Sequence, residues 1–188
     1  MRVFIAVDIE KDCLEKIERL QEELWKKAEL RKGDVTLVKP EAMHLTLKFL
    51  GEVDDEAVVD VCKATEEAVG ECKRFELGIE GVGSFGGESP KVVWIGTKEG
   101  SEELCRMQEE IEDRLAAIGF GRENREFAGH LTLCRVKNFK AGLKLSKAIR
   151  EYKNYRVAAT AVESVCVYAS ELTSAGPRYT VLKKCVLK

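Results

Sequence analysis

Histidine is scarce in this chain of 188 residues, which contains only two, His44 and His130. The seven cysteines include no CxxC pair. A zinc site of cysteine and histidine needs closely spaced ligands, so two dispersed histidines argue against one. An odd number of scattered cysteines is typical of reduced thiols, and it predicts a cytoplasmic protein.

Long hydrophobic runs and a positive charge excess are also missing. No apolar run approaches the roughly 18 residues of a membrane span, and the opening MRVFIAVDIEKD is unlike a signal peptide. The 31 basic and 33 acidic residues give a formal net charge of −2. Proteins that bind long nucleic acid nonspecifically usually carry a basic excess, so we expect contact with one end or one phosphate of a polyanion. We expect a monomer with no membrane partner.

Both histidines stand in the same four-letter word, HLTL, which occurs twice. The words begin at His44 and at His130, close to half of the chain apart. Each follows a stretch in which apolar residues recur at steps of three and four, which is typical of an amphipathic helix. The repeat indicates two related halves, and the mixture of strands and helices indicates an α+β fold.

We therefore predict one bilobal domain over residues 1–188, with two pseudo-symmetric halves, each with an antiparallel sheet covered by helices, and a central cleft between them. Asp8 is the expected N-cap of the first helix. The glycine-rich residues 81–90 and the link at residues 173–177 should be loops. Beside the HLTL words, strands are expected over residues 3–7, 35–38, 75–79, 92–95, 155–168 and 179–187.

The HLTL words place polar side chains on one face of a strand. Side chains alternate along a strand, so His44, Thr46 and Lys48 should share one face and the leucines the other. His130 and Thr132 should share a face by the same rule. Two such strands that face a common cleft would arrange two imidazoles and two hydroxyls around one small ligand.

This arrangement suits hydrolysis of a phosphodiester. One imidazole can remove a proton from the attacking water while the other delivers a proton to the leaving ester oxygen. The hydroxyls of Thr46 and Thr132 would donate hydrogen bonds to the non-bridging oxygens, and Lys48 would add positive charge. We expect no metal and no cofactor, because the sequence offers no cluster of carboxylates to hold a metal ion.

The segments HLTLKFLG and HLTLCRV resemble the paired HxT motifs of the two-histidine phosphoesterase superfamily. Within it, the chain is similar to RNA 2',3'-cyclic phosphodiesterases, also called 2'-5' RNA ligases. The similarity extends to MRVFIAVDI, GVGSFGGESPKVVWIG and ELTSAGPRYTVLKK. It implies a bilobal α+β fold and an activity that opens a terminal 2',3'-cyclic phosphate to a 2'-phosphate, with 2'-5' ligation as the reverse. The implied partner is an RNA 3' end or a short oligonucleotide.

The resemblance also implies roles for single residues. His44 and His130 become the acid and base pair, and Thr46 and Thr132 become phosphate donors. Arg135 matches a phosphate-binding arginine. Strict alternation turns Arg135 to the leucine face, so it could reach the phosphate only from the strand end or past a β-bulge.

Five other side chains near the motifs carry expectations. Cys134, where the family commonly has alanine, should be a small packing residue. Phe49 and Trp94 are expected in the core. Phe85 and Tyr179 lie in or near predicted loops and are candidates to stack a terminal base.

Two other functions fit the same features. One is a binding module that senses a nucleotide such as AMP, and the other is a phosphodiesterase of small nucleotides. The intact pair of motifs favours catalysis. The sequence leaves open which histidine is the acid and which the base.

Overall fold

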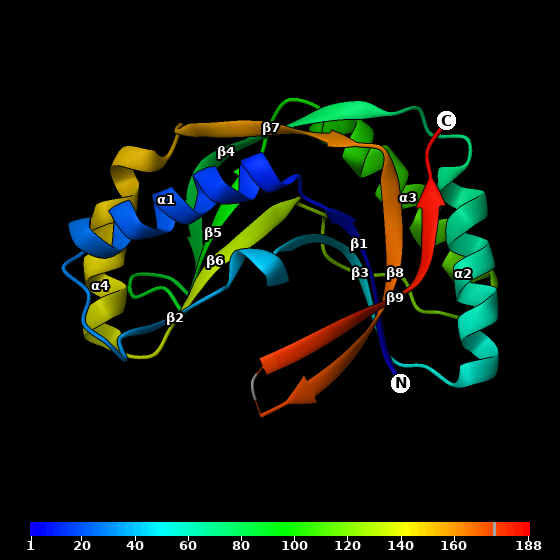
Figure 1. Cartoon of the computed structure of the whole chain (residues 1–188), viewed down its shortest axis with the longest axis horizontal. Helices are drawn as coiled ribbons and strands as arrows, with labels where there is room; N and C mark the ends of the chain where they lie inside the picture. The colour runs from blue at the N-terminus through cyan, green and yellow to red at the C-terminus, as the bar shows by residue number, and fades with distance from the viewer. Residues whose placement is uncertain (175) are drawn as a thin grey trace.

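The chain folds into two β-sheets with helices packed on them, in a computed structural model that describes residues 1–174 and 176–188 (Figure 1). Residue 175, within the predicted link, lies outside the described residues. In chain order the elements are β1 Arg2–Asp8, α1 Lys11–Lys27, β2 Val35–Leu37, η1 Pro40–Ala42, β3 His44–Glu52, α2 Asp55–Val69, β4 Phe75–Phe85, β5 Val92–Thr97, α3 Ser101–Ala117, β6 His130–Val136, α4 Phe139–Ala148, η2 Ile149–Tyr152, β7 Arg156–Val162, β8 Ser164–Thr173 and β9 Gly176–Val186.

Each sheet contains one HLTL strand. The four-stranded sheet has the order β3-β1-β8-β9, and the five-stranded sheet has the order β2-β6-β5-β4-β7. All of these strand pairs are antiparallel. The predicted α+β class with two antiparallel sheets is confirmed. Neither sheet is built from consecutive strands, because β2 joins the five-stranded sheet while β1 and β3 join the other.

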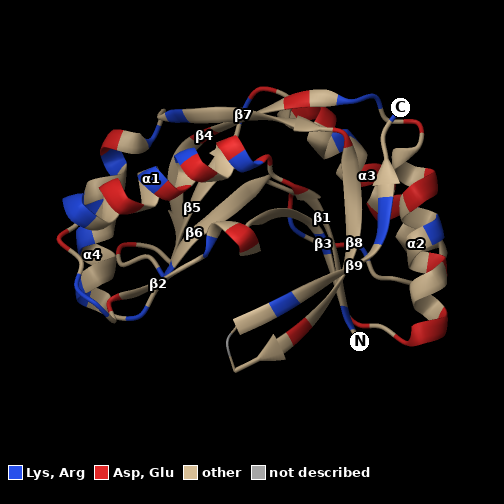
Figure 2. Cartoon of the chain, viewed as in Figure 1, with Lys and Arg blue, Asp and Glu red and all other residues tan. Residues whose placement is uncertain are grey.

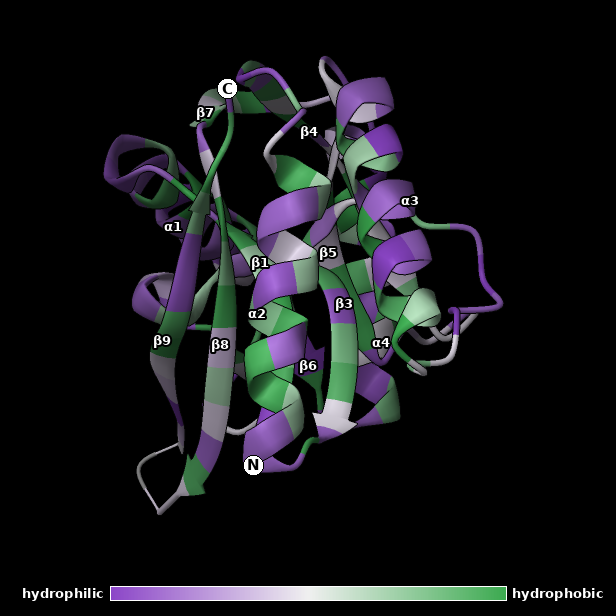
Figure 3. Cartoon of the chain, turned by 90° about the vertical axis from the view of Figure 1, so that its right-hand side faces the viewer, coloured by the Kyte–Doolittle hydropathy of each residue, from purple (hydrophilic) through white to green (hydrophobic). Residues whose placement is uncertain are grey.

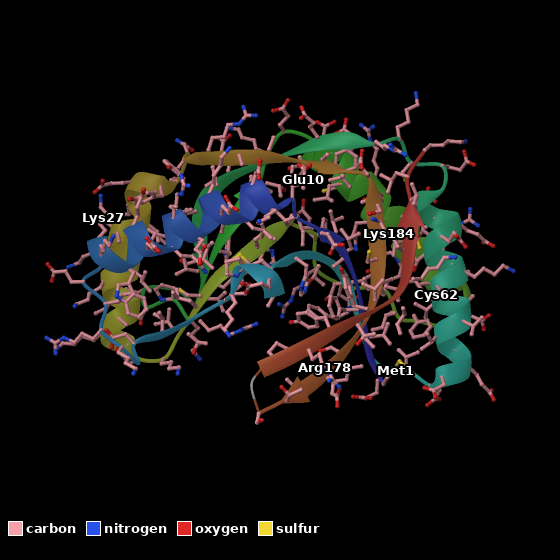
Figure 4. The ribbon with its side chains drawn as sticks, in the orientation of Figure 1. Met1, Glu10, Lys27, Cys62, Arg178 and Lys184 are labelled. Atoms are coloured by element: carbon pink, nitrogen blue, oxygen red, sulfur yellow. The ribbon has the colours of Figure 1, made fainter. Side chains whose placement is uncertain are left out.

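The helices divide between the sheets. α1 and α4 lie against the five-stranded sheet, and α2 lies against the four-stranded sheet (Figures 1 and 3). α3 lies beside α2 and contacts one strand of each sheet, β3 and β4. Figure 4 labels Glu10 and Lys27, which mark the two ends of α1. The helix begins after Glu10 rather than at the predicted cap Asp8, since Asp8 is still part of β1. Among the described residues, no helix has the length and apolarity needed to cross a membrane.

The leucines of the HLTL words anchor both strands in the core. Those of β3 and β6 are between 0% and 4% exposed. Full burial of one leucine contributes about 1.5–3 kcal/mol. The polar side chains between these leucines are therefore presented on a strand that the core holds in place. The four leucines are Leu45, Leu47, Leu131 and Leu133.

Three predicted elements were wrong. The link expected at residues 173–177 is mostly strand, because Thr173 ends β8 and Gly176 begins β9. The expected strand at residues 155–168 is two strands, β7 and β8, which belong to different sheets. The expected loop at residues 81–90 begins as strand, because β4 continues to Phe85. Gly83 lies under the indole of Trp94, and a Cβ atom there would come within 2.3 Å of the ring atom Cη2. This glycine makes room for a ring instead of forming a turn.

Candidate functional site

The first HLTL word lies on β3, along its pairing with β1. Directly opposed residues on antiparallel strands share a face of the sheet. His44 is paired with Asp8 and Thr46 with Ala6. His44 and Thr46 are half-buried, while Leu45 between them is fully buried. The predicted separation of a polar face from a leucine face is confirmed for these residues.

The second word repeats this arrangement on β6, along its pairing with β5. His130 is paired with Gly96 and Thr132 with Trp94. His130 and Thr132 are half-buried, and Leu131 between them is 1% exposed. Both histidines therefore remain partly open to solvent, as a substrate site requires.

A β-bulge interrupts the first word at its second leucine. Thr46 is paired with Ala6 of β1. Lys48 is paired with the adjacent residue, Ile5, so Leu47 is left without a partner. A bulge of one residue reverses the face that the following side chains occupy. The alternation rule therefore fails from Lys48 onward.

The second word contains the same bulge. Thr132 is paired with Trp94 of β5, and Cys134 is paired with the adjacent Val93. Leu133 therefore has no paired residue on β5, just as Leu47 has none on β1. The repeat of the sequence is therefore matched by a repeat of backbone irregularity.

A buried glutamine contacts the carbonyl of each bulged leucine. Gln21 of α1 donates from Nε2 to the Leu133 oxygen at 2.7 Å, and Gln108 of α3 donates to the Leu47 oxygen at 3.5 Å. The two glutamines are 4% and 6% exposed. A buried carbonyl needs a hydrogen-bond partner. The Leu133 oxygen also accepts from the backbone N–H of Val38 at 3.0 Å, so Gln21 is a second donor there.

The first bulge overturns the prediction that Lys48 shares a face with His44. The ammonium of Lys48 lies behind the sheet, where it donates to a carboxylate oxygen of Glu112 at 2.7 Å and to the carbonyl of Gly121 at 2.8 Å. The Lys48 side chain is only 6% exposed. Its charge neutralises Glu112 and does not face the histidines.

The second bulge resolves the conflict over Arg135. It turns Arg135 to the face of His130 and Thr132, where it is exposed. Cys134 takes the buried position, and burial raises the pKa of its thiol to about 11. This placement fits the predicted packing role. The equivalent reversal in β3 leaves Phe49 73% exposed, so the prediction that Phe49 lies in the core was wrong.

Aromatic rings surround the imidazole of His44. Its ring centroid lies 4.6 Å from that of Phe4, in a stacked arrangement, and 5.0 Å from that of Tyr179, edge to face. The ring of Tyr168 in turn stacks on that of Phe4, with 5.1 Å between their centroids. Of these rings, only Tyr179 was singled out from the sequence. Phe4 and Tyr168 sit in apolar strands, and no sequence signal distinguished them from core residues.

Burial controls the protonation of His44. It lowers the pKa of the imidazole from the ordinary value of 6.5, and the Asp8 carboxylate and a backbone hydrogen bond with Ala42 oppose it more weakly. Neutral imidazole is therefore favoured near pH 7. The carboxylate of Asp8 also accepts a hydrogen bond from the hydroxyl of Tyr168. Sequence reasoning treated Asp8 only as a helix cap, because its pairing with His44 depends on register.

The imidazole of His130 is oriented by a backbone carbonyl two residues before it. Nδ1 lies 2.8 Å from the carbonyl oxygen of Ala128. A carbonyl only accepts hydrogen bonds, so Nδ1 carries the hydrogen and Nε2 is left for other partners. The ring lies 5.3 Å from Phe85 and 5.9 Å from Trp94. Trp94, predicted in the core, is half-buried on the face of Thr132.

The two half-sites approach each other where the sheets meet. Some Cα atoms of β3 and β6 lie within 8 Å of each other, and Figure 1 shows the two strands converging at the centre of the molecule. The ring of Tyr179, on β9, contacts that of His44, and its phenol interacts electrostatically with Arg135 of β6. Burial raises the pKa of the phenol, and the guanidinium of Arg135 opposes this rise. Side chains from both sheets therefore lie around Tyr179.

Comparison with known proteins gives a consistent result. The sequence profile of the family described as "LigT like Phosphoesterase" matches residues 7–94 and 95–179, one HLTL word in each. A protein of Archaeoglobus fulgidus named "RNA 2',3'-cyclic phosphodiesterase" is 35% identical over 97% of this chain and 98% of its own length. A Thermotoga maritima protein of the same name is 34% identical over 98% of this chain and 95% of its own.

A solved structure has the same fold. The structure of Escherichia coli LigT complexed with 3'-AMP superimposes with a TM-score of 0.78 over 99% of this chain and 97% of that one, at 24% identity. The resemblance drawn from the HLTL words is confirmed at the level of the family. Since the two matched segments together span most of the chain and each holds one HLTL word, this protein belongs to the LigT-like phosphoesterase family.

Proposed function

We propose that this protein is a metal-independent RNA 2',3'-cyclic phosphodiesterase, which opens a terminal cyclic phosphate to leave a 2'-phosphate. The observation that carries this proposal is the duplicated half-site. Each of two adjoining strands presents one imidazole and one hydroxyl on one face, and the region between them also receives Arg135. The names of the relatives from Archaeoglobus fulgidus and Thermotoga maritima support the same activity.

In the proposed reaction, His44 and His130 act on opposite sides of one phosphorus atom. One imidazole takes a proton from the attacking water, and the other gives a proton to the departing 3' oxygen of the ribose. Negative charge grows on the non-bridging oxygens, toward which Thr46 and Thr132 donate hydrogen bonds. Arg135 adds positive charge at the same place. In each half a backbone carbonyl holds the imidazole, which limits the reorientation needed during the reaction.

Aromatic rings beside the imidazoles, the exposed Phe85 and the half-buried Tyr179, would hold the terminal base. Phe85 lies 5.3 Å from His130, and Tyr179 lies 5.0 Å from His44, as expected for rings that flank a nucleotide at this site. The exposed Phe49 extends the ring cluster at 5.9 Å from Phe4. Stacking of a base on an aromatic ring contributes about 1–3 kcal/mol.

A turnover assay with a chelator tests the proposal. The substrate is a short oligonucleotide that ends in a 2',3'-cyclic phosphate, and the expected product ends in a 2'-phosphate. Arg135→Ala should raise KM more than it lowers kcat, while Lys48 variants should affect stability first. Binding of AMP without any turnover would instead support a nucleotide sensor. Turnover of cyclic mononucleotides alone would support a small-nucleotide phosphodiesterase.

A ligation reaction follows from the same chemistry, with the 3' oxygen of the ribose again as the leaving group. An oligonucleotide with a 5'-hydroxyl can replace water as the nucleophile, which would form a 2'-5' linkage. Supplying such an oligonucleotide at high concentration tests this extension. The monomeric state, the cytoplasmic location and the single folding unit over residues 1–188 remain predictions.

A further inference from the structure

The charge of this chain is unevenly distributed. The 24 residues from 127 to 150 contain six cations and no carboxylate, which leaves 25 cations and 33 acids, a net −8, for the other 164 residues. The overall charge of −2 therefore conceals a strongly basic segment. The six cations are Arg135, Lys137, Lys140, Lys144, Lys147 and Arg150. We call this set the basic strip.

The basic strip begins at the candidate active site and leads away from it. Arg135 lies on the face of His130, and Lys137 follows at the exposed end of β6. Lys140, Lys144 and Lys147 are spaced by four and three residues, so they share one face of α4 over a length of about 10 Å. Figure 2 shows the blue segments along α4 and in the loop that precedes it.

The cations of the basic strip are not neutralised by neighbours. None of the six forms an ion pair with a residue that the structure describes, whereas 13 of the other 25 cations do. The carboxylate of Asp34 lies close enough to Lys144 for their charges to interact, but it forms no ion pair with any of the six. Lys144 donates only to the backbone oxygen of Glu29.

The four-stranded sheet offers fewer unpaired cations. On the β8-β9 hairpin, Arg178, labelled in Figure 4, is bound to Glu171. Further along β9, Lys183 pairs with Glu66 of α2 at 2.8 Å, and Lys184, on the face of Thr46, is exposed without an ion pair among the described residues. A polyanion that leaves the histidines over β9 would therefore meet one unpaired lysine, whereas one that leaves over β6 and α4 would meet six cations without ion pairs.

We propose that the basic strip binds the phosphate backbone of the single-stranded RNA that precedes the reacting 3' end. This inference rests on the proposed function, since the terminal phosphate fixes where the strand begins. Arg135 acts at the reacting phosphate, whereas the five other cations of the strip would add affinity for a long substrate without touching the reacting phosphorus. Turnover of a mononucleotide would therefore not depend on those five.

The test is the double variant Lys137→Gln/Lys140→Gln, two exposed side chains outside the reacting region. The matched control is Lys63→Gln/Lys73→Gln, also exposed and without an ion pair among the described residues, on and after α2. The probe is an RNA decanucleotide that ends in a 2'-phosphate, which binds without reacting. Affinity is measured at several salt concentrations.

Each phosphate contact contributes about 0.7 to the slope of log affinity against log salt for a single strand. Loss of two contacts should reduce the slope by about 1.4, so that between 50 and 200 mM salt the wild-type affinity falls about sevenfold further than that of the variant. The control should keep the wild-type slope. Equal slopes in the variant and the control would overturn the inference. Hydrolysis of a cyclic mononucleotide, measured separately, reports on the proposed function itself.

Discussion

Replacement of Lys48 by methionine tests the reversal of faces in β3. The side chains of Lys48 and Glu112 are 6% and 5% exposed, and their charged atoms are 2.7 Å apart. Glu112 also accepts hydrogen bonds from Gln108 at 3.1 Å and from the backbone of Glu123 at 3.2 Å. Removal of the ammonium would leave a buried carboxylate without its cation.

The expected cost is large. Breaking a buried ion pair by removing one partner costs about 3–5 kcal/mol. For a domain of this size each kcal/mol lowers Tm by about 2–4 °C, which gives a total of about 6–20 °C. Thermal and urea unfolding measure the loss. Lys183→Met is the matched control, because its pair with Glu66 has a similar distance, 2.8 Å, but the two side chains are 38% and 55% exposed. An exposed pair contributes at most about 1 kcal/mol.

A double variant sharpens the result. Lys48→Met/Glu112→Met removes both charges, and replacing a whole buried pair with apolar side chains is often neutral. It should recover most of the lost stability and keep the KM of the wild type. An unchanged Tm in Lys48→Met, together with a raised KM, would contradict the buried pair with Glu112 and would show that Lys48 contacts the substrate.

Three further predictions concern the histidines and Cys134. His44→Ala and His130→Ala should each lower turnover at least a hundredfold, within the roughly 10²–10⁴ contribution of general acid or base catalysis; a near-normal rate in either would contradict the pairing. Burial holds the pKa of His44 below 6.5, so the unfolded chain binds a proton at this imidazole before the folded chain does as pH falls. The contribution of neutral His44 to the free energy of unfolding is therefore complete above about pH 6.5 and is lost below it. Wild type should therefore lose more unfolding free energy than His44→Gln between pH 7.5 and pH 5; equal losses would argue against this. The buried Cys134 thiol, with its pKa raised to about 11, should resist alkylation at pH 8 in the folded protein, and Cys134→Ala should keep turnover; inactivation by labelling at this residue would show that it is exposed.

The sequence predicted the motifs better than it predicted their surroundings. The alternation of HLTL correctly placed His44 and Thr46 opposite the leucines, because four residues of one strand need no information from elsewhere. The two bulges could not be inferred, since they appear only in the register of β3 with β1 and of β6 with β5. For this reason Lys48 and Phe49 were assigned to the wrong faces.

The internal repeat itself indicates that the faces are reversed after each HLTL word. Aligning the two words places Lys48 opposite Cys134 and Phe49 opposite Arg135. A cysteine at the first of these positions suits a buried site, and an arginine at the second suits an exposed one. Comparison of the halves could therefore have indicated the reversal, whereas the contact of Asp8 with the site depends on strand pairing alone.

The central claim is that two imidazoles flank a single phosphorus atom. A crystal structure with bound adenosine 2'-phosphate tests it most directly. We expect the phosphate between β3 and β6, with Nε2 of His44 and Nε2 of His130 each within hydrogen-bond distance of a different phosphate oxygen. A phosphate that contacts only one of the two rings, or that binds away from both, would contradict the account.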